Sequence, residues 1–588
     1  MQLFRQRPTE HPLSRLFPTI VTVLFLAAAL VLAGCDNDDD DGGMGTMPDP
    51  TITELAGNAS NLSTLAGALG QAGLDDDLNG DGPFTVFAPS NAAFQQIDVN
   101  DLTSDSDLLE EVLTYHVVQG EITASDISDG QTVETLEGET LRFSVSNGGV
   151  QVNGANVTTA DLQASNGVVH VIDGVLLETV TTTERALLTP QLSTLTDAVV
   201  AAGLDDDLNG DGPFTVFAPV DAAFGDIDAS ELTADSDLLN KILTYHVVGG
   251  SAIEAGDISD GQTVETLQGG DLTFSVDGGT VRVNGIEVTT ANIQTSNGVV
   301  HLIDSVLLEA ATTTERAVLT PQLSTLTDAV VAAGLDDDLN GDGPFTVFAP
   351  VDAAFGDIDA GELTADSDLL SKVLTYHVVA GSAIEAGDIS DGQTAETLQG
   401  GDLSFSVDGG TVRVNGIPVT TADIQTSNGV VHLIDGVLLE ATTVTERAIL
   451  TPTFSTLADL VVQAGLDDDL NGSGPFTVLA PTNQAFLDAL DANDNGQIDG
   501  NEVPSQSQLE SILTYHVIAG SAVESSAISD GQSVETLEGS DVTFGVSGGT
   551  ITVNPSAENA TVAAPDVQVS NGIIHGIDTV LTPPSGSN

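Results

Sequence analysis

The stretch Gly-Pro-Phe-Thr-Val-Phe-Ala-Pro-Val-Asp-Ala-Ala-Phe at residues 212–224 decides how this chain is organised, because its first five residues occur four times. These copies begin at Gly82, Gly212, Gly343 and Gly474, at intervals of 130 or 131 residues. Such a period is that of a whole domain and far exceeds the roughly 20 to 50 residues of a solenoid unit. The sequence therefore predicts four independently cored domains, at residues 51–180, 181–311, 312–442 and 443–583.

Helical patterns come first in each repeat and strand patterns follow. In the second repeat, a proline near the start and an apolar stripe predict a helix at residues 190–202, and a second stripe predicts another at 237–245. Short runs rich in β-branched and aromatic residues predict strands at 214–219, 272–276, 280–285 and 297–304. Helices followed by strands within one unit indicate an α+β fold.

Three segments of each repeat resemble successive signature stretches of the fasciclin domain family. In the second repeat they are residues 212–224, Leu-Thr-Tyr-His-Val at 243–247, and 297–307. The resemblance covers roughly residues 50–583 and implies a β-sheet wedge packed with several α-helices in each domain. It also implies a secreted or surface-anchored protein that mediates cell adhesion or matrix contacts.

A Tyr-His pair lies in the second signature stretch of every repeat, at Tyr115 and His116, Tyr245 and His246, Tyr376 and His377, and Tyr515 and His516. In some animal members of the family this region is implicated in integrin binding. Nothing in the sequence shows a host-facing lifestyle, so that role is not transferred. An imidazole at a helix end can bond the last carbonyls and favour the helix dipole, which predicts a structural role for these histidines.

The N-terminal residues predict export and a lipid anchor. Basic residues precede an apolar run at 20–32, and Leu32-Ala33-Gly34-Cys35 resembles the lipobox of bacterial lipoproteins. Residues 1–35 are thus expected to be a signal peptide that ends at a lipidated Cys35, residues 36–50 an acidic flexible tether, and residues 584–588 a tail. We expect a lipid-anchored, extracytoplasmic protein of the cell envelope, with the choice of inner or outer membrane open.

Acidic residues dominate the charge of the chain. It has 11 Lys and Arg against 88 Asp and Glu, a formal net charge of -77 at pH 7. Such a charge repels phosphate backbones, so nucleic acid is excluded as a partner. The expected partners are other cell-surface proteins, polysaccharide or matrix, with membrane contact only through the lipid anchor.

Catalytic patterns are not evident in the sequence. His170 and Asp173 are three residues apart, which on a strand places them on opposite faces, so they form no local dyad. We find no glycine-rich phosphate loop, no His-x-x-x-His metal pair and no nucleophile elbow. The prediction is a protein that is not an enzyme, although a triad built from distant residues stays open at this stage.

The fourth repeat contains a calcium-loop pattern. Thirty residues separate Phe486 from His516, where the other repeats have 22 between the equivalent residues. The additional segment matches the twelve-residue loop of EF-hands, with glycine at the sixth position. The candidate Ca²⁺ ligands are Asp491, Asn493, Asn495, Gln497 through its carbonyl, Asp499 and Glu502. The alternative is a surface turn rich in Asp, Asn and Gly.

A weaker acidic pattern, Asp-Asp-Asp-Leu-Asn-Gly, occurs in every repeat without the final glutamate of a calcium loop. These candidate weak cation sites comprise Asp75, Asp77, Asn79 and Asp81, then Asp205, Asp207, Asn209 and Asp211, and then Asp336, Asp338, Asn340 and Asp342. Otherwise they are acidic turns after a helix, where Asp would oppose the helix dipole.

Two functions remain open from the sequence. The first is an envelope-anchored adhesion or extracellular-matrix protein acting through multivalent, calcium-dependent contacts. The second is a periplasmic module that binds a ligand or polysaccharide, with an apolar pocket between sheet and helices and no role in adhesion.

Overall fold

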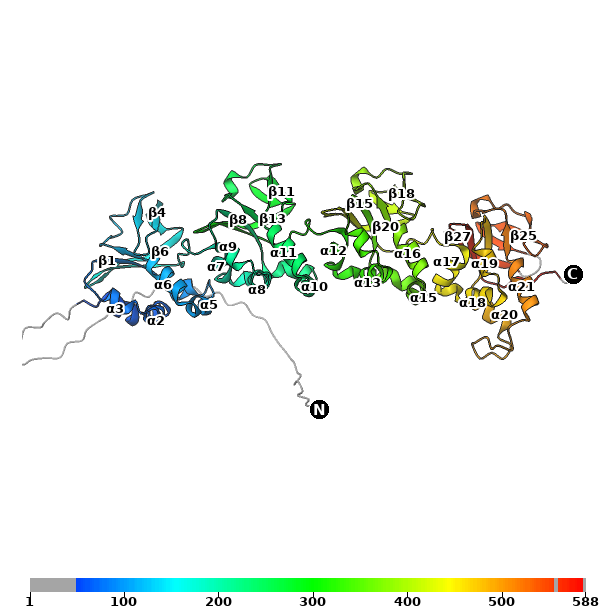
Figure 1. The fold of residues 1–588 in the computed structure, drawn as a ribbon, viewed down its shortest axis with the longest axis horizontal. Coiled ribbons are helices and arrows are strands. Elements are labelled where there is room, and N and C mark those ends of the chain that lie inside the picture. Colours follow the sequence, from blue (N-terminus) through cyan, green and yellow to red (C-terminus); the bar gives the residue numbers. More distant parts are fainter. Residues whose placement is uncertain (1–48, 147, 555–558, 585–588) are drawn as a thin grey trace, which may run out of the picture. The chain divides into compact units, whose positions relative to one another are not determined.

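The computed structural model describes residues 49–146, 148–554 and 559–584. The predicted signal peptide and Cys35 lie outside the described residues, as do most of the tether and the tail. Within the described part, each repeat contains one seven-stranded sheet whose helices lie along one side of it (Figure 1). The predicted α+β fold is confirmed. No helix among these residues is long and apolar enough to cross a membrane.

The second repeat serves as the example for all four. Its elements are α7 Thr182–Leu187, the 3₁₀ turn η1 Pro190–Leu192, α8 Ser193–Ala202, α9 Asp205–Leu208, β8 Phe214–Pro219, η2 Asp221–Asp226, α10 Ala229–Ala234, α11 Ser236–Tyr245, β9 Val247–Gly249, η3 Ala255–Asp257, β10 Thr263–Glu265, β11 Asp271–Asp277, β12 Thr280–Val283, β13 Ile286–Thr295 and β14 Gly298–Ile303.

The first and third repeats follow the same order. The first has α1 Ile52–Asn58, α2 Ser63–Ala72, α3 Asp75–Leu78, β1 Phe84–Pro89, α4 Asn91–Phe94, α5 Val99–Ser104, α6 Ser106–Tyr115, β2 Val117–Gln119, β3 Thr132–Glu134, β4 Thr140–Ser146, β5 Gly149–Val152, β6 Ala155–Ala164 and β7 Gly167–Ile172. The third has α12 Thr313–Val318, η4 Pro321–Leu323, α13 Ser324–Ala333, α14 Asp336–Leu339, β15 Phe345–Pro350, η5 Asp352–Asp357, α15 Ala360–Ala365, α16 Ser367–Tyr376, β16 Val378–Ala380, η6 Ala386–Asp388, β17 Thr394–Glu396, β18 Asp402–Asp408, β19 Thr411–Val414, β20 Ile417–Thr426 and β21 Gly429–Ile434.

The fourth repeat differs before its long helix, where the calcium-loop pattern replaces the short helix that corresponds to α10. Its elements are α17 Val444–Leu450, η7 Pro452–Phe454, α18 Ser455–Ala464, α19 Asp467–Leu470, β22 Phe476–Pro481, α20 Asn483–Leu490, α21 Gln506–Tyr515, β23 Val517–Ala519, η8 Ser525–Ala527, β24 Ser533–Glu535, β25 Asp541–Ser547, β26 Thr550–Val553, β27 Ala560–Val569 and β28 Gly572–Ile577.

The sheet of the second repeat has the strand order β10-β11-β12-β13-β14-β8-β9. Only β14 and β8 pair in parallel, with His301 opposite Phe217, and the other neighbours are antiparallel. The backbone N–H of Leu267, just after β10, donates to the carbonyl of Val247 in β9 at 2.7 Å. This bond links the two ends of the sheet, so the sheet curls into a nearly closed wedge.

Two glycines of the signature stretches are required by close backbone contacts. A Cβ at Gly298 would lie 2.2 Å from the carbonyl oxygen of Phe214, and one at Gly212 would lie 1.9 Å from that of Asn297. No side chain can occupy such a space without moving the backbone. The Gly-Pro-Phe-Thr-Val and Asn-Gly stretches are therefore two halves of one tight contact between β8 and β14.

Local sequence signals set the helix ends. The Asp235 side chain accepts the backbone N–H groups of Asp237 and Leu238 and so caps α11. Helix α8 ends at Gly203, whose φ of 67° is in the left-handed region that glycine adopts without strain. The helices predicted at 190–202 and 237–245 are confirmed in these positions.

The junctions between repeats differ from the expected picture of independent domains. Leu188 follows α7 of the second repeat, yet it is fully buried in the hydrophobic core of the first repeat. Its carbonyl accepts the backbone N–H of Asp98 at 3.1 Å. Leu319 and Leu450 are likewise buried in the cores of the second and third repeats. Each of the first three repeats thus completes its core with a leucine from the next one.

Candidate functional site

The Tyr-His motif places its histidine inside the domain. In the second repeat, His246 is 2% exposed, its Nδ1 lies 2.8 Å from the carbonyl of Ile242, and its Nε2 accepts the backbone N–H of Leu307 at 2.9 Å. Because Nε2 is the acceptor, Nδ1 must carry the proton that Ile242 accepts. Burial lowers the pKa of His246 to about 4, partly offset by the Ile242 bond. The histidine is therefore neutral and does not act as a cation on the helix dipole.

The other three motif histidines have the same partners in their own repeats. His116, His377 and His516 each lie beside a carbonyl one turn earlier in the helix and accept a backbone N–H from the segment after the last strand. The structural role predicted for them agrees with these contacts. Each imidazole fixes the long helix to the end of the sheet.

The second repeated histidine, on the last strand, is also buried. His301 has its Nε2 2.8 Å from the Ile253 carbonyl, and its Nδ1 accepts the backbone N–H of Asn292 at 3.3 Å. Its ring stacks on Phe217 with centroids 5.4 Å apart. Both nitrogens are thus engaged by backbone groups, so His301 has no free nitrogen to act as a catalytic base.

The tyrosine hydroxyl of the motif belongs to a polar network with strand β11 and the turn after β12. The Tyr245 hydroxyl donates to the Asp271 carbonyl at 2.8 Å and accepts from Nδ2 of Asn284 at 3.0 Å. Burial, followed by the charge of Glu309, raises the pKa of Tyr245 to about 12. The hydroxyl stays protonated under physiological conditions and acts as a structural donor.

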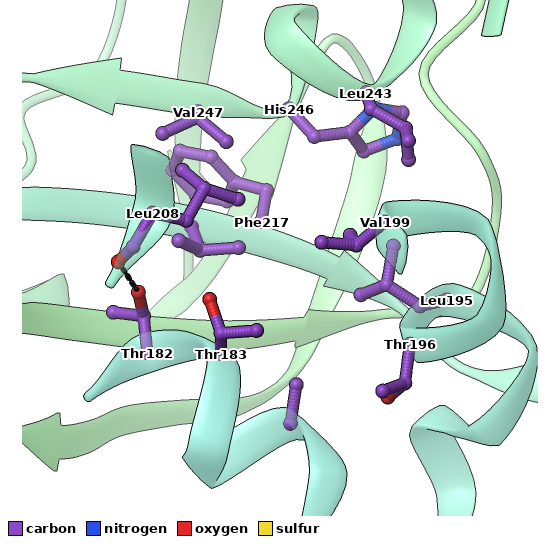
Figure 2. Close-up of a pocket in the computed structure, with 12 residues that line it drawn as sticks. Thr182, Thr183, Leu195, Thr196, Val199, Leu208, Phe217, Leu243, His246 and Val247 are labelled. Carbon is purple, nitrogen blue, oxygen red and sulfur yellow. Dashed lines mark hydrogen bonds between the residues drawn. The ribbon is translucent and has the colours of Figure 1, made fainter. Parts of the chain in front are cut away.

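A small apolar cavity lies between the helices and the sheet in the second repeat (Figure 2). Its volume is about 30 Å³, and Leu195, Val199 and Phe217 are among the residues that line it. Equivalent cavities of about 30 and about 20 Å³ occur in the third and fourth repeats. A cavity of this size has room for about one water molecule and for no larger ligand.

The repeated acidic segments form short helices rather than turns. Asp205, Asp206 and Asp207 occupy the first turn of α9, where carboxylates interact favourably with the helix dipole. The carboxylates thus begin one helix, α9, and also follow the end of α8 at Gly203. The Asn209 side-chain oxygen accepts the Thr181 hydroxyl, so it already serves to hold the start of α7.

The calcium-loop segment turns its carboxylates inward. Asp491 accepts the backbone N–H groups of Asn495 and Gly496, at 3.1 and 2.7 Å. Glu502 accepts the backbone N–H of Asn493 through Oε1 at 3.1 Å and that of Asp499 through Oε2 at 2.9 Å. Gly496 has a φ of 78°, as the sixth position of such a loop requires. Helices α20 and α21 lie on either side.

The donor chemistry of this loop fits calcium, which binds hard oxygen ligands. Asn493 and Asn495 both donate through Nδ2 to Oδ2 of Asp499, so three of the predicted ligand residues already contact one another. Across the described residues, no group of three or more His, Cys, Asp and Glu is placed to hold a metal ion. A Ca²⁺ ion here would therefore need the amide oxygens and the Gln497 carbonyl besides the carboxylates.

A sequence profile of the fasciclin domain matches residues 60–178, 190–309, 321–440 and 452–583. This chain belongs to the fasciclin domain family. The four matches correspond to the four repeats, and together they cover most of the chain.

Relatives of this fasciclin protein include animal proteins that match most of this chain and bacterial proteins with a shorter match. The transforming growth factor-beta-induced protein ig-h3 of Sus scrofa is 31% identical over 526 residues, which cover 87% of this chain and 74% of the relative. Human periostin is 29% identical over 87% of this chain and 61% of its own length. Protein sll1483 of Synechocystis is 47% identical over 132 residues, 22% of this chain and 73% of the relative.

A solved FAS1 domain pair from the insect cell adhesion molecule fasciclin I covers 42% of this chain and 97% of its own length. The sequence identity is 22% and the TM-score is 0.22.

Asn297 is a key residue that the sequence analysis missed. Its Nδ2 donates to the carbonyls of Leu208 and Gly210, at 2.8 and 3.0 Å, and its Oδ1 accepts the N–H of Thr182 at 2.9 Å. It thereby joins the start of α7 and the end of α9 to the last strand. Its recurrence as Ser-Asn-Gly in all four repeats was the available signal.

Proposed function

We propose that this protein is a cell-envelope-anchored adhesion or extracellular-matrix protein whose four fasciclin domains act through multivalent contacts. The proposal depends on one observation: the same domain occurs four times, and its repeated histidines serve in packing. Four linked copies raise the effective concentration at a surface without any strong single site. Membership of the fasciclin family supports the same function.

The alternative of a binding module with an apolar ligand pocket between sheet and helices receives less support. The cavities between helices and sheet, at about 30 Å³ in the second and third repeats, are far below the roughly 300 to 1,000 Å³ of ordinary ligand pockets. Contacts with cell-surface proteins, polysaccharide or matrix would instead use the outer faces of the domains. Export and lipidation at Cys35 would hold those faces outside the cytoplasm.

Calcium is proposed to act at the loop of residues 491–502 in the fourth domain. Its inward carboxylates and its position between α20 and α21 support this assignment. Bound Ca²⁺ would neutralise part of the local negative charge and stiffen the loop. Adhesion that involves this face would then depend on the free calcium concentration.

Cell aggregation tests the proposal directly. Cells that display the full chain should aggregate, or attach to matrix, more than cells of a deletion strain. A chain with Cys35→Ala, which cannot be lipidated, should be released from the cells, and aggregation should be lost with it. Equal aggregation of the deletion strain and the parent would reject the adhesion function. A chelator that left aggregation unchanged would reject only the calcium part.

A further inference from the structure

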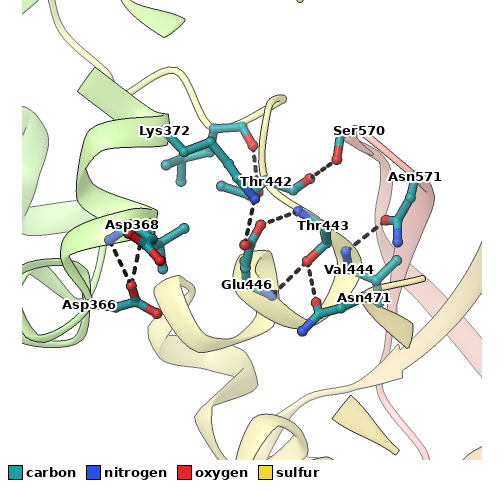
Figure 3. A network of polar contacts seen from close by, with 12 residues as sticks. Asp366, Asp368, Lys372, Thr442, Thr443, Val444, Glu446, Asn471, Ser570 and Asn571 are labelled. Atoms are coloured by element: carbon teal, nitrogen blue, oxygen red, sulfur yellow. Dashed lines mark hydrogen bonds and ion pairs between the residues drawn. The ribbon is translucent and has the colours of Figure 1, made fainter. Parts of the chain in front are cut away.

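The three junctions between domains share one arrangement. At each of them a threonine begins the first helix of the following domain, and a glutamate in the first turn caps that helix. At the third junction, the Thr443 backbone N–H donates to Oε2 of Glu446 at 2.7 Å (Figure 3). Glu446 therefore has one oxygen committed to its own helix and the other available to the preceding domain.

A lysine of the preceding domain takes that second oxygen. Nζ of Lys372, on α16, lies 2.6 Å from Oε1 of Glu446, and the two side chains are only 30% and 20% exposed (Figure 3). At the second junction, Lys241 of α11 lies 2.7 Å from Oε1 of Glu315, with similar exposure. Both pairs are partly shielded from solvent, which makes them stronger than fully exposed ion pairs.

The first junction has a carboxylate where the others have the lysine. Glu111 holds the sixth position of α6, as Lys241 does in α11 and Lys372 in α16. Glu184 nevertheless caps α7 as Glu315 caps α12, with the Thr181 N–H donating to its Oε2 at 2.7 Å. Two acidic residues thus occupy the positions that form an ion pair at the other junctions.

No basic group compensates this carboxylate within the part of the chain that the structure describes. The charged groups that act on Glu111 are Glu184 on α7 and Glu137 in the turn after β3, and the Thr179 hydroxyl is its polar neighbour. Burial, followed by these two carboxylates, raises the pKa of Glu111, and the Thr179 contact offsets part of the rise. The charged form of Glu111 is thus disfavoured where it lies.

The first and fourth domains differ at three of the positions used in the junctions. In α1, the first helix of the first domain, Leu55 stands at the position of Arg185, and exposed Asn58 stands at that of the buried Leu188. In α21, the long helix of the fourth domain, Ser511 stands at the position of Lys241. Within the described repeats, the lysine occurs in α11 and α16, and each of these helices is followed by a domain that supplies a glutamate.

From this comparison we propose that the junction between the first and second domains opens more readily than the other two, because Glu111 and Glu184 occupy the positions of the lysine–glutamate pair. The chain then behaves as one separable domain followed by a coupled unit of three. This division is independent of calcium and of the adhesion function.

Cleavage by an arginine-specific protease can measure how readily each of the three junctions opens in one experiment. Arg185, Arg316 and Arg447 occupy equivalent helical positions, each between a glutamate and an alanine, and all three are partly buried. Cleavage after each arginine therefore requires its junction to open, and its rate follows the open population when reclosing is fast. In the intact chain at low salt, cleavage after Arg185 should be about threefold to tenfold faster than after Arg316 or Arg447.

Reciprocal charge changes provide the matched controls. Glu111→Lys should slow cleavage after Arg185 to the rate at the other two junctions. Lys241→Glu should speed cleavage after Arg316 and leave Arg447 unchanged. Rates at the unaltered junctions of the same chain show that each variant is folded. The proposal is overturned if the three rates are equal in the original chain, or if Glu111→Lys leaves the Arg185 rate unaltered.

Discussion

Nε2 of His246 accepts the backbone N–H of Leu307 at 2.9 Å, across 61 residues of sequence. The same ring bonds the Ile242 carbonyl through Nδ1, so one imidazole joins the end of α11 to the segment that leaves β14. A buried N–H without a partner costs about 1 to 3 kcal/mol. This pairing gives the recurring histidine a structural role in every repeat, because it satisfies a buried N–H group.

The buried histidines should make the protein sensitive to acid. His116, His246 and His377 have pKa values lowered to about 4, below the ordinary value of 6.5, because burial disfavours the charged ring. The unfolded chain therefore binds more protons than the folded one. The free energy of unfolding of each domain should be at its full value above about pH 6.5. It should fall by about 3 kcal/mol as the pH decreases towards 4, because the unfolded chain then binds the proton that the buried histidine excludes.

Hydrogen exchange resolved by domain measures this acid effect between pH 7 and 5, after correction for intrinsic exchange. His246→Gln serves as the internal control, because it should weaken the pH dependence in the second domain while the third domain, with His377, keeps it. Equal pH dependence of the second domain in the variant and the original chain would contradict the role given to His246.

Gly298→Ala should disrupt the second domain. The added Cβ would lie 2.2 Å from the Phe214 carbonyl oxygen, so β8 and β14 would have to separate. We expect the free energy of unfolding of the second domain to fall by about 3 kcal/mol or more. Calorimetry should then show this domain unfolding at a lower temperature than the other three. Gly256→Ala is the matched control, because its Cβ meets nothing within 4 Å. Equal unfolding profiles of the two variants would refute the close-contact explanation.

Asn297→Ala should loosen the start of the second domain. The change removes three hydrogen bonds, to Thr182, Leu208 and Gly210, and leaves the two carbonyls and the N–H without this partner. A cost of about 2 to 4 kcal/mol is expected. Hydrogen exchange should accelerate at α7 and α9 but not at the equivalent α12 and α14 of the third domain, where Asn428 is unchanged. Unaltered hydrogen-exchange protection of α7 would contradict the role given to Asn297.

Calcium binding to the fourth domain can be measured by titration calorimetry on the intact chain. Glu502→Gln should weaken binding at least about tenfold, since it removes the charge of the twelfth-position ligand. Asp494→Asn removes one charge from the same loop at a position outside the predicted ligand set, and it should bind nearly as well. Equal weakening by both variants would mean that only general negative charge attracts the ion. If the original chain bound no calcium, the proposed calcium site would be rejected.

Much of the fold followed from the sequence because its signals are local or periodic. The four repeats, the helices at 190–202 and 237–245, and the last strand were all predicted from spacing and apolar pattern. The glycine after α8 and the aspartate before α11 also gave clear helix boundaries. Each of these signals depends on neighbours within a few residues, where the preferences of single residues act directly.

The polar partners could not be predicted in the same way. Asn297 binds groups near residues 182, 208 and 210, and nothing in the sequence states that these segments meet. The acidic segments were expected to be turns after a helix, but they form short helices. The long-range hydrogen bonds of Asn297 were beyond the reach of local sequence signals.

By itself, the sequence determined that this protein is a fourfold repeat of an α+β domain with an extreme negative charge, since repetition, apolar periodicity and composition are properties of the chain. Only the tertiary structure decided that a leucine at the end of each junction helix completes the core of the preceding domain, and that Lys241 and Lys372 pair with glutamates of the next domain. Those facts depend on which side chains folding brings together, and partial burial there strengthens the ion pairs.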